Sequence, residues 1–481
     1  MAGLDGQSLW RDEVDAIRFA GYPLPELLHT FTTPGQNGPL YFLLLRPWLA
    51  LAGASEFSLR FFSVFFGTLT VALVYRLSRT LIPGEQGQHT GALAALLAAT
   101  SPYLIWYSQE GKMYTLVVAL VLASMLCYLT ALRRGDWRYW LGYTVVTSAC
   151  FYVHLIAALI IPVQVLIFFL GRWNRRARLR AWLLCLAVLV LPYLPLLTWQ
   201  LPALIQKVDT GYRFFPLDKM LLALLTDYSL GVAAANGLWV LALFAAVALG
   251  TLLAWVVARP ARSRPVHVTI LLVWLLLPPL SLFLITLRRP MFTTRYLIFI
   301  LPAYLLLLAT GLLAVARRSR LVAGALLAAL LVVNGWNAWS QARAPVKADY
   351  RAATYYVLEN LTPDDLVLFQ IPYGRYSFDY YLEQWTARHP GRLAPGLSTA
   401  GEAAYRWAEG LYTNTGMSPD EADRLMAEIS AGSQTIWLVE SEQAMWDSRA
   451  LVHQWLDTHG TLASQAGFTR VAVYRYVLPS R

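Results

Sequence analysis

The sequence predicts a polytopic α-helical membrane protein that ends in a small α/β domain. Of its 481 residues, 57% are hydrophobic and only 14% are charged, whereas about 25% of residues are charged in soluble globular proteins. The mean hydropathy is +0.48. Apolar segments long enough to cross a bilayer recur between residues 58 and 340. From about residue 341 charged residues become frequent and apolar runs shorten.

The N-terminal residues 1–57 are expected to form a loop outside the cytoplasm. After Asp12 and Glu13, apolar residues recur at nearly helical spacing up to residue 31, which predicts a short amphipathic helix on the membrane surface, broken at prolines. Residues 39–53 are apolar but short, and Arg46 precedes a proline in their middle, so an interfacial or re-entrant segment is favoured over a span.

Ten spans are predicted after this loop, which together form a transmembrane helical domain, residues 58–340. Their approximate limits are 58–82, 90–106, 114–132, 137–153, 155–171, 181–199, 238–258, 266–287, 294–316 and 320–340.

Loop charge orients these spans. The net charge is +11, and most of it is arginine in short alternate loops, such as those at residues 76–79, 133–138, 172–180, 259–264 and 317–320. The positive-inside rule makes these loops cytoplasmic, so the charge indicates topology and not a nucleic-acid partner. The predicted location is the plasma membrane, with residues 1–57 and the C-terminal domain on the extracytoplasmic side. Residues 1–57 have no apolar segment before them that could carry them across the membrane, so we expect a further N-terminal span. If residues 39–53 crossed the bilayer, residues 1–37 would be cytoplasmic instead.

The C-terminal residues 341–481 alternate predicted helices with strands. Helices are expected over 349–361, 377–383, 419–429 and 443–459, and strands over 365–371, 434–440 and 468–477. This alternation is typical of an α/β domain. The cysteines Cys127, Cys150 and Cys185 lie in apolar runs without metal-ligand spacing, so no disulfide framework or metal site is assigned.

Polar residues on the predicted outer face are few. The set considered for chemistry includes Asp12, Glu13, Glu110, Lys112, His154, Arg288, Arg289 and Arg295. Transfer of a sugar from a phosphate-linked donor needs a base for the acceptor proton and cations for the departing phosphate, and this set supplies both. Each residue also has a structural interpretation: the two acids suit a helix start, the arginines suit membrane-edge anchoring, and a lone histidine is commonly structural.

Several motifs, taken in order, resemble bacterial glycosyltransferase family 39. They are Ser-Leu-Trp-Arg-Asp-Glu at 8–13, Asn-Gly-Pro-Leu-Tyr-Phe-Leu-Leu-Leu at 37–45, Ser-Glu-Phe-Ser-Leu-Arg-Phe-Phe-Ser at 55–63, Tyr-Ser-Gln-Glu-Gly-Lys-Met-Tyr at 107–114, and Arg-Tyr-Leu at 295–297 with Pro302. The ordered set covers roughly residues 4–340 and is far more specific than any one motif. The family belongs to the C-fold (GT-C) membrane glycosyltransferases, with the protein O-mannosyltransferases and the lipid A aminoarabinose transferase.

The resemblance implies a polyprenyl-phosphate-sugar donor, inversion at the anomeric carbon and a catalytic acid in the first outer loop. By this resemblance Asp12 is the base or metal-site candidate, Glu13 its neighbour, and Glu110 the acid of the second outer loop. Lys112, Arg288, Arg289, Arg295, His154 and Tyr296 are the predicted substrate-binding residues.

The chain departs from the family pattern at two motifs. Asn-Gly-Pro replaces the usual His-Pro-Pro at 37–39, and Lys112 replaces an arginine, which keeps the charge but loses the bidentate fork. The acceptor is expected to be a protein, a lipid or a glycan. No cofactor is certain; an Asp-Glu pair offers oxygen ligands for a divalent cation, but two carboxylates are too few to define a site.

Two other functions fit the same composition. A transporter or flippase for lipid-linked sugars would use the cationic cavity without chemistry. Transporters, however, tend to have internal repeats and ionisable residues at the bilayer midplane. Here the span interiors are nearly free of charge, which favours the enzyme. A non-catalytic assembly subunit is the third interpretation.

Overall fold

The computed structural model describes residues 3–30, 38–171, 173, 175–191, 213–232, 244, 266–389 and 405–479. The predicted span 238–258 apart from residue 244, the end of the predicted span 181–199 and the motif residue Asn37 lie outside them. The chain forms two compact units. The first unit combines Met1–Arg18 with Pro345–Arg481, and the second comprises Phe19–Ala344.

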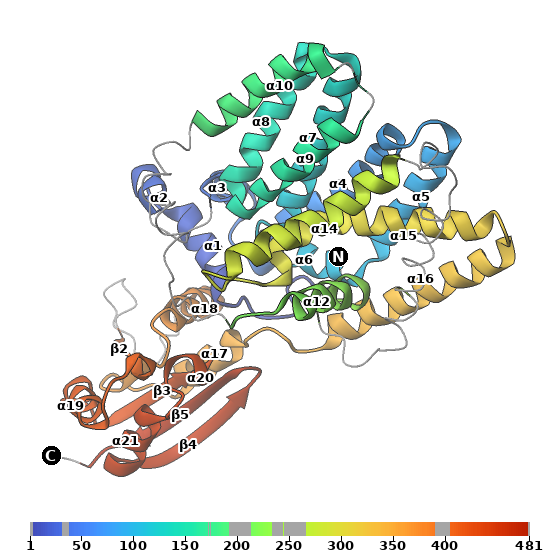
Figure 1. Ribbon diagram of the computed structural model, residues 1–481. Helices are drawn as coiled ribbons and strands as arrows, with labels where there is room; N and C mark the ends of the chain where they lie inside the picture. The colour runs from blue at the N-terminus through green and yellow to red at the C-terminus, as the bar shows by residue number, and fades with distance from the viewer. Residues whose placement is uncertain are drawn as a thin grey trace. The chain divides into compact units, whose positions relative to one another are not determined.

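The second unit is a bundle of helices (Figure 1). Its described helices are the end of α1 (Arg11–Gly21), α2 (Leu24–Thr30), α3 (Leu40–Ala52), α4 (Glu56–Leu81), α5 (Gly84–Thr100), α6 (Pro102–Ser108), α7 (Tyr114–Arg134), α8 (Trp137–Val153), η1 (Leu155–Leu159), α9 (Ile160–Leu170), α10 (Arg175–Val190), α12 (Leu217–Leu230), α14 (Val266–Thr286), η4 (Thr294–Ile300), α15 (Leu301–Ala316) and α16 (Arg320–Arg343). Within the described residues, five segments are long and apolar enough to cross a membrane: α4, α7, α14, η4 with α15, and α16. The predicted multi-pass helical architecture is confirmed.

One predicted span, 90–106, is divided between α5 and α6. Ser101 ends α5 and caps α6, since its side chain accepts a hydrogen bond from the Leu104 amide at 3.3 Å. Pro102 follows at the first position of α6, where a missing amide proton is tolerated. A serine followed by proline therefore starts a new short helix and does not continue the old one.

Small residues let α4, α5, α6 and α7 approach closely. A β-carbon at Gly67 would lie 2.1 Å from the Ser108 hydroxyl oxygen, and one at Gly91 would lie 3.0 Å from the Tyr75 ring. Thr115 donates a hydrogen bond of 2.9 Å to the Ser63 carbonyl across the α4–α7 contact. Helices in a bilayer associate through such close packing and interhelical hydrogen bonds, because lipid is as apolar as their side chains.

A buried polar network joins α7, α8 and α9. Gln164 donates to the Ser124 hydroxyl at 3.1 Å and accepts from Tyr143 at 2.9 Å. Ser124 and Thr147 are hydrogen-bonded at 2.7 Å, and Tyr128 donates to the Gln164 carbonyl at 2.7 Å. Because these polar groups form hydrogen bonds with one another, they are buried at little desolvation cost. The network therefore holds the three helices against one another.

The first unit contains a five-stranded sheet in the order β2-β1-β3-β5-β4. The strands are β1 (Leu366–Phe369), β2 (Arg406–Glu409), β3 (Thr435–Glu440), β4 (Thr461–Phe468) and β5 (Val471–Val477). β1 pairs in parallel with β2 and β3, whereas β5 pairs antiparallel with β3 and β4. The predicted α/β domain is confirmed. β2 and β4, which carry few apolar residues, were not predicted.

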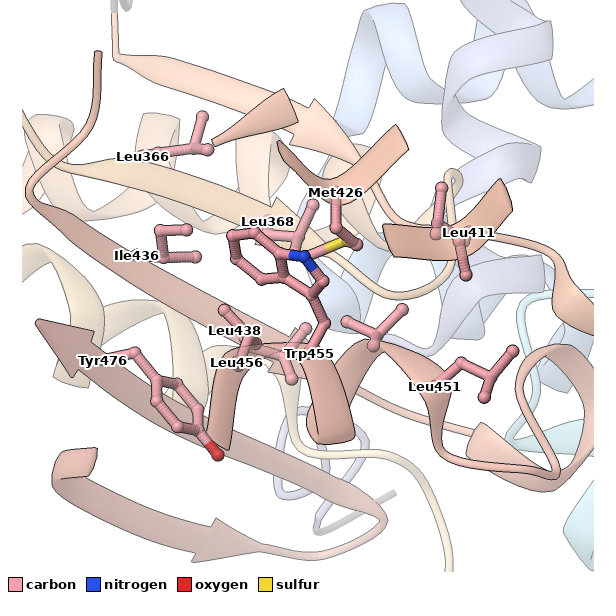
Figure 2. Close-up of a cluster of buried hydrophobic side chains, with 12 residues drawn as sticks. Leu366, Leu368, Leu411, Met426, Ile436, Leu438, Leu451, Trp455, Leu456 and Tyr476 are labelled. Atoms are coloured by element: carbon pink, nitrogen blue, oxygen red, sulfur yellow. The ribbon is translucent and has the colours of Figure 1, made fainter. Parts of the chain in front are cut away.

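Helices cover both faces of this sheet, because β1 and β3 are buried on both sides. Leu368 and Leu438 pack on α19 (Pro419–Ile429) and α21 (Leu451–His459). Figure 2 shows the indole ring of Trp455 from α21 among the aliphatic side chains of β1 and β3. On the other face, Phe369 contacts Phe378 of α18 (Gly374–Arg388), and Trp437 contacts Tyr356 of α17 (Tyr350–Asn360).

The predicted helix 443–459 is wrong in one respect, because it is two helices. α20 (Gln443–Trp446) ends before Asp447, and α21 begins at Leu451. The Asp447 carboxylate is buried and accepts hydrogen bonds of 2.9 Å from the amides of Leu451 and Val452. Ala450 has a φ of 55°, which turns the chain between the two helices. An aspartate that caps the second helix competes with continuation of the first.

Replacing this aspartate tests its capping role. Asp447→Ala should loosen α21 by about 1–2 kcal/mol, or about five- to thirtyfold in local opening. Hydrogen exchange of peptides covering residues 451–459, measured by mass spectrometry on the full chain, should accelerate accordingly. Asp420→Ala, in the exposed first turn of α19, is the control and should leave α21 exchange unchanged. Equal exchange in Asp447→Ala and wild type would show that the cap does not hold this helix.

Candidate functional site

The segment that carries Asp12 is held by the C-terminal part of the first unit. Leu9 is fully buried, and its amide donates a hydrogen bond of 2.6 Å to the Tyr381 hydroxyl of α18. Ser8 lies 3.1 Å from the same hydroxyl and accepts from the Arg351 amide at 3.1 Å. Residues more than 340 positions apart therefore fix the entry into α1.

Asp12 and Glu13 occupy the first turn of α1, where carboxylates suit the helix dipole. The Asp12 carboxylate lies 3.2 Å from Nε of Arg11, and its side chain is 18% exposed. The Arg11 guanidinium also lies over the Tyr373 ring, 4.3 Å from its centroid, and 3.7 Å from the Glu442 carboxylate. Asp12 is thus a partly accessible carboxylate beside a cation that other groups keep in place.

Glu13 has a different environment from its neighbour. Its side chain is fully buried, and Nζ of Lys347 lies 2.8 Å from its Oε1. Lys347 is itself only 9% exposed, and its amide donates a hydrogen bond of 3.1 Å to the Gln7 side chain. A buried charge is tolerated when an opposite charge and hydrogen bonds compensate for the lost water, which is what Lys347 provides.

Arg18, one turn from the end of α1, contacts a tyrosine of α18, as Arg11 contacts Tyr373. Its guanidinium lies over the Tyr376 ring, 3.1 Å from the centroid, and it pairs with Asp15 at 2.8 Å. Arg11 and Arg18 therefore both stack on tyrosines near the start of α18. Cation–π contacts of this kind orient the helix that carries the Asp-Glu pair.

The Tyr-Ser-Gln-Glu-Gly-Lys-Met-Tyr motif at 107–114 belongs to the second unit. Glu110 is buried between α6 and α7, and Lys112 follows in the same turn. The Ser63 hydroxyl donates to the Lys112 carbonyl at 3.0 Å, which fixes the turn on α4. Gly111 is required at its position, because a β-carbon there would lie 2.5 Å from the Leu59 side chain. The spacing Glu-Gly-Lys therefore has a packing reason as well as a chemical one.

Arg295, Tyr296 and His154 lie together in the second unit. The His154 ring is 5.2 Å from the Tyr296 ring and 6.3 Å from the Tyr114 ring. The Arg295 guanidinium is 5.7 Å from the centroid of Tyr114 and 6.0 Å from that of Tyr296. The sequence predicted three of these residues as substrate-binding, and the structure brings them together around Tyr114, which was not predicted.

Burial governs the charge of His154. Burial first, and then the neighbouring Arg295 guanidinium, lower the pKa of His154 to about 4. The ring is therefore neutral at pH 7 and does not add to the positive charge of Arg295. Among the described residues, its Nε2 atom has no hydrogen-bond partner.

Arg288 and Arg289 come directly after α14. Arg288 is exposed, Arg289 is half-buried, and both backbone amides donate to the Ile285 carbonyl at 3.1 Å. They therefore complete the last turn of the helix, at a position that also suits membrane-edge anchoring.

Sequence reasoning missed α12, which holds η4 in place. Ser229 of α12 is hydrogen-bonded to Tyr304 of α15 at 2.7 Å. The two residues before it bind η4 itself: Asp227 accepts from Thr294 at 2.5 Å, and Tyr228 donates to the Leu297 carbonyl at 2.7 Å. Arg295 and Tyr296 lie inside the segment that they fix.

Burial raises the pKa of Asp227, and the Thr294 hydrogen bond partly opposes this shift. Several ionisable groups also lie near Tyr107. Burial raises its pKa, as do Tyr103, Glu110 and Asp227, whereas Arg295 lowers it. Asp227, one of two aspartates in the apolar stretch 217–230, was the available signal for α12.

The predicted site residues are divided between the two units. Asp12 and Glu13 belong to the first unit, and Glu110, Lys112, His154, Arg288, Arg289, Arg295 and Tyr296 belong to the second. Among the described residues, no group of three or more His, Cys, Asp or Glu side chains is placed to hold a metal ion. A divalent cation at Asp12 remains a prediction.

Comparison with known proteins adds a family match and a fold. Residues 36–199 match the family model described as dolichyl-phosphate-mannose-protein mannosyltransferase. No curated protein sequence matches the chain.

Solved structures match over nearly the whole chain. ArnT from Cupriavidus metallidurans in the apo state has a TM-score of 0.60 at 14% identity, over 98% of this chain and 95% of ArnT. The same protein bound to undecaprenyl phosphate has a TM-score of 0.56 at 13% identity, with the same coverage. The Archaeoglobus fulgidus oligosaccharyltransferase in complex with Zn and sulfate has a TM-score of 0.54 at 16% identity, over 97% of this chain and 69% of that one.

The sequence-based resemblance is therefore confirmed by two independent findings. One is the mannosyltransferase family model over residues 36–199. The other is the fold, which the chain shares with ArnT and with the archaeal oligosaccharyltransferase. The chain has the C-fold of membrane glycosyltransferases.

Proposed function

We propose that the protein is an inverting membrane glycosyltransferase that moves a sugar from a polyprenyl-phosphate carrier to an acceptor outside the cytoplasm. The observation that carries this proposal is the group formed by Arg295, Tyr296 and neutral His154 in a chain with this fold. A cation among aromatic rings is suited to bind a phosphate near an apolar chain. The similar ArnT structure bound to undecaprenyl phosphate supports a donor of this class.

In the proposed reaction, the acceptor oxygen attacks the anomeric carbon while the bond from that carbon to the phosphate oxygen breaks. Asp12 takes the acceptor proton, and the polyprenyl phosphate leaves with the electron pair of the broken bond. Arg295 and Lys112 stabilise the charge that develops on this phosphate. A lipid phosphate leaves readily, so no general acid is required. The donor sugar follows from the assay below, and the acceptor is a protein, a lipid or a glycan.

The two acids of the first outer loop have separate proposed roles. Asp12 is partly exposed and therefore able to meet an acceptor hydroxyl, which favours it as the base. Glu13 is buried and paired with Lys347, which favours a positioning role. Glu110, buried beside Tyr107, is proposed as the second acid of the site, and Arg288 and Arg289 as outer contacts of the donor.

Asp12→Asn should abolish transfer, because the amide cannot take the acceptor proton; we expect a loss of about 10²–10⁴-fold. The assay uses the full reading frame in membranes and a panel of radiolabelled polyprenyl-phosphate sugars, with loss of label from the lipid as the readout. Asp15→Asn, in the same helix, is the matched control. Normal turnover by Asp12→Asn would contradict the proposed mechanism. If wild type turned over no donor, transport would be favoured instead.

Arg295→Gln should weaken donor binding, since a hydrogen bond to a charged group contributes about 1.5–3 kcal/mol, or about tenfold or more in Kd. Binding is measured by displacement of a labelled polyprenyl phosphate from the purified chain. Arg343→Gln, an exposed arginine at the end of α16, is the control. An unchanged Kd in Arg295→Gln would refute the phosphate role.

The Lys347–Glu13 pair separates positioning from chemistry. Lys347→Met removes the ammonium group that lies 2.8 Å from the buried Glu13 carboxylate and should destabilise the chain by about 3–5 kcal/mol. The double variant Glu13→Gln with Lys347→Met removes both charges, so its thermal midpoint should return towards wild type. If Glu13 only positions the helix, transfer returns with stability. A stable but inactive double variant would instead assign Glu13 to the chemistry.

A further inference from the structure

A cavity of about 360 Å³ lies at one end of the helical bundle, and none of the candidate site residues lines it. Its lining, within the described residues, includes Arg76 and Arg79 from the end of α4 and Arg133 and Arg134 from the last turn of α7. Residues three apart on a helix lie on one face, so Arg76 and Arg79 point the same way. The volume is in the range of small-molecule sites, about 300–1,000 Å³.

These four arginines lack acidic partners. Within the part of the chain that the structure describes, none of them forms an ion pair with a carboxylate. The nearby Asp136 accepts the Arg138 amide at 3.0 Å and so caps α8. Like charges gathered without counter-charges repel one another, and an anion in the cavity would relieve this repulsion.

Membrane topology accounts for arginines at this end but not for their arrangement. The positive-inside rule requires cations near the cytoplasmic surface, wherever they point. Here they surround a hollow that also contains Thr80 and Thr130, whose hydroxyls donate to the carbonyls of Arg76 at 3.0 Å and Leu126 at 2.7 Å. Arg134 donates to the Tyr139 hydroxyl at 3.2 Å, which holds one guanidinium at the rim.

The inner part of the cavity is apolar. Leu126 and Cys127 line it, and Leu126 precedes Arg133 by seven residues on α7. At the rise of an α-helix this separation is about 10 Å. The cavity therefore changes from cationic to apolar over about the length of a lipid headgroup, towards the predicted membrane interior.

We propose that this four-arginine pocket binds the headgroup phosphate of an anionic membrane phospholipid from the cytoplasmic leaflet. Guanidinium groups bind phosphate oxygens in bidentate geometry, and basic pockets between spans on the cytoplasmic side suit anionic headgroups. The apolar floor receives the glycerol backbone and the start of the acyl chains. A free phosphate would use the arginines but not the floor. This site is independent of the proposed glycosyl transfer.

Lipid binding tests the proposal on the purified full chain in neutral detergent, with dioleoylphosphatidylglycerol as the probe and native mass spectrometry as the readout. Wild type should bind this lipid more tightly than dioleoylphosphatidylcholine. The double variant Arg76→Gln with Arg133→Gln should bind it about 30-fold more weakly. Gln keeps much of the apolar stem, so the loss reports charge and not packing.

The control is Arg317→Gln with Arg318→Gln, an exposed pair on the same predicted face but outside the lining. It should bind phosphatidylglycerol as wild type does. If the double pocket variant does not fold, the single variant Arg79→Gln serves, with an expected loss of about fivefold.

Three results would overturn the proposal. The first is equal phosphatidylglycerol binding by folded pocket variants and wild type. The second is an equal loss in the control, which would indicate a general charge effect. The third is full displacement of the lipid by inorganic phosphate at an equal concentration, which would assign the pocket to a soluble phosphate.

Discussion

A fully buried carboxylate next to the proposed base constrains the first unit. The Glu13 side chain is fully buried, and the ammonium group of Lys347 at 2.8 Å compensates its charge. This pair works only if α1 and residue 347 are held together, and the hydrogen bonds of Ser8 and Leu9 to Tyr381 and Arg351 do so. The C-terminal residues are therefore part of the structure that presents Asp12.

The second unit meets a different constraint, because packing in a bilayer gains little from the hydrophobic effect. Close contacts at Gly67 and Gly91 and the Gln164 network take its place. Hydrogen bonds also hold η4, the segment that contains Arg295: consecutive residues of α12 bind Thr294 and the Leu297 carbonyl. This support keeps Arg295 in position for the phosphate that we propose it binds.

Much of the fold could be predicted because its signals are local. Long apolar runs gave α4, α7, α14 and α16, and apolar runs with β-branched residues gave β1 and β3. The elements that were missed lack such signals: β2 and β4 are short of apolar residues and pair only with strands already in place. The break at Asp447 was missed because capping depends on where its carboxylate points.

The sequence by itself determined the membrane class, several of the spans, the C-terminal α/β domain and the candidate residues, since composition, periodicity and ordered motifs are properties of neighbouring positions. Only the tertiary structure decided how these residues differ from one another. It buried Glu13 against Lys347 and left Asp12 partly exposed, and it gathered His154, Arg295 and Tyr296. It also placed four arginines from two predicted cytoplasmic loops around one cavity. Burial and charge pairing arise from contacts between distant residues, which no local pattern records.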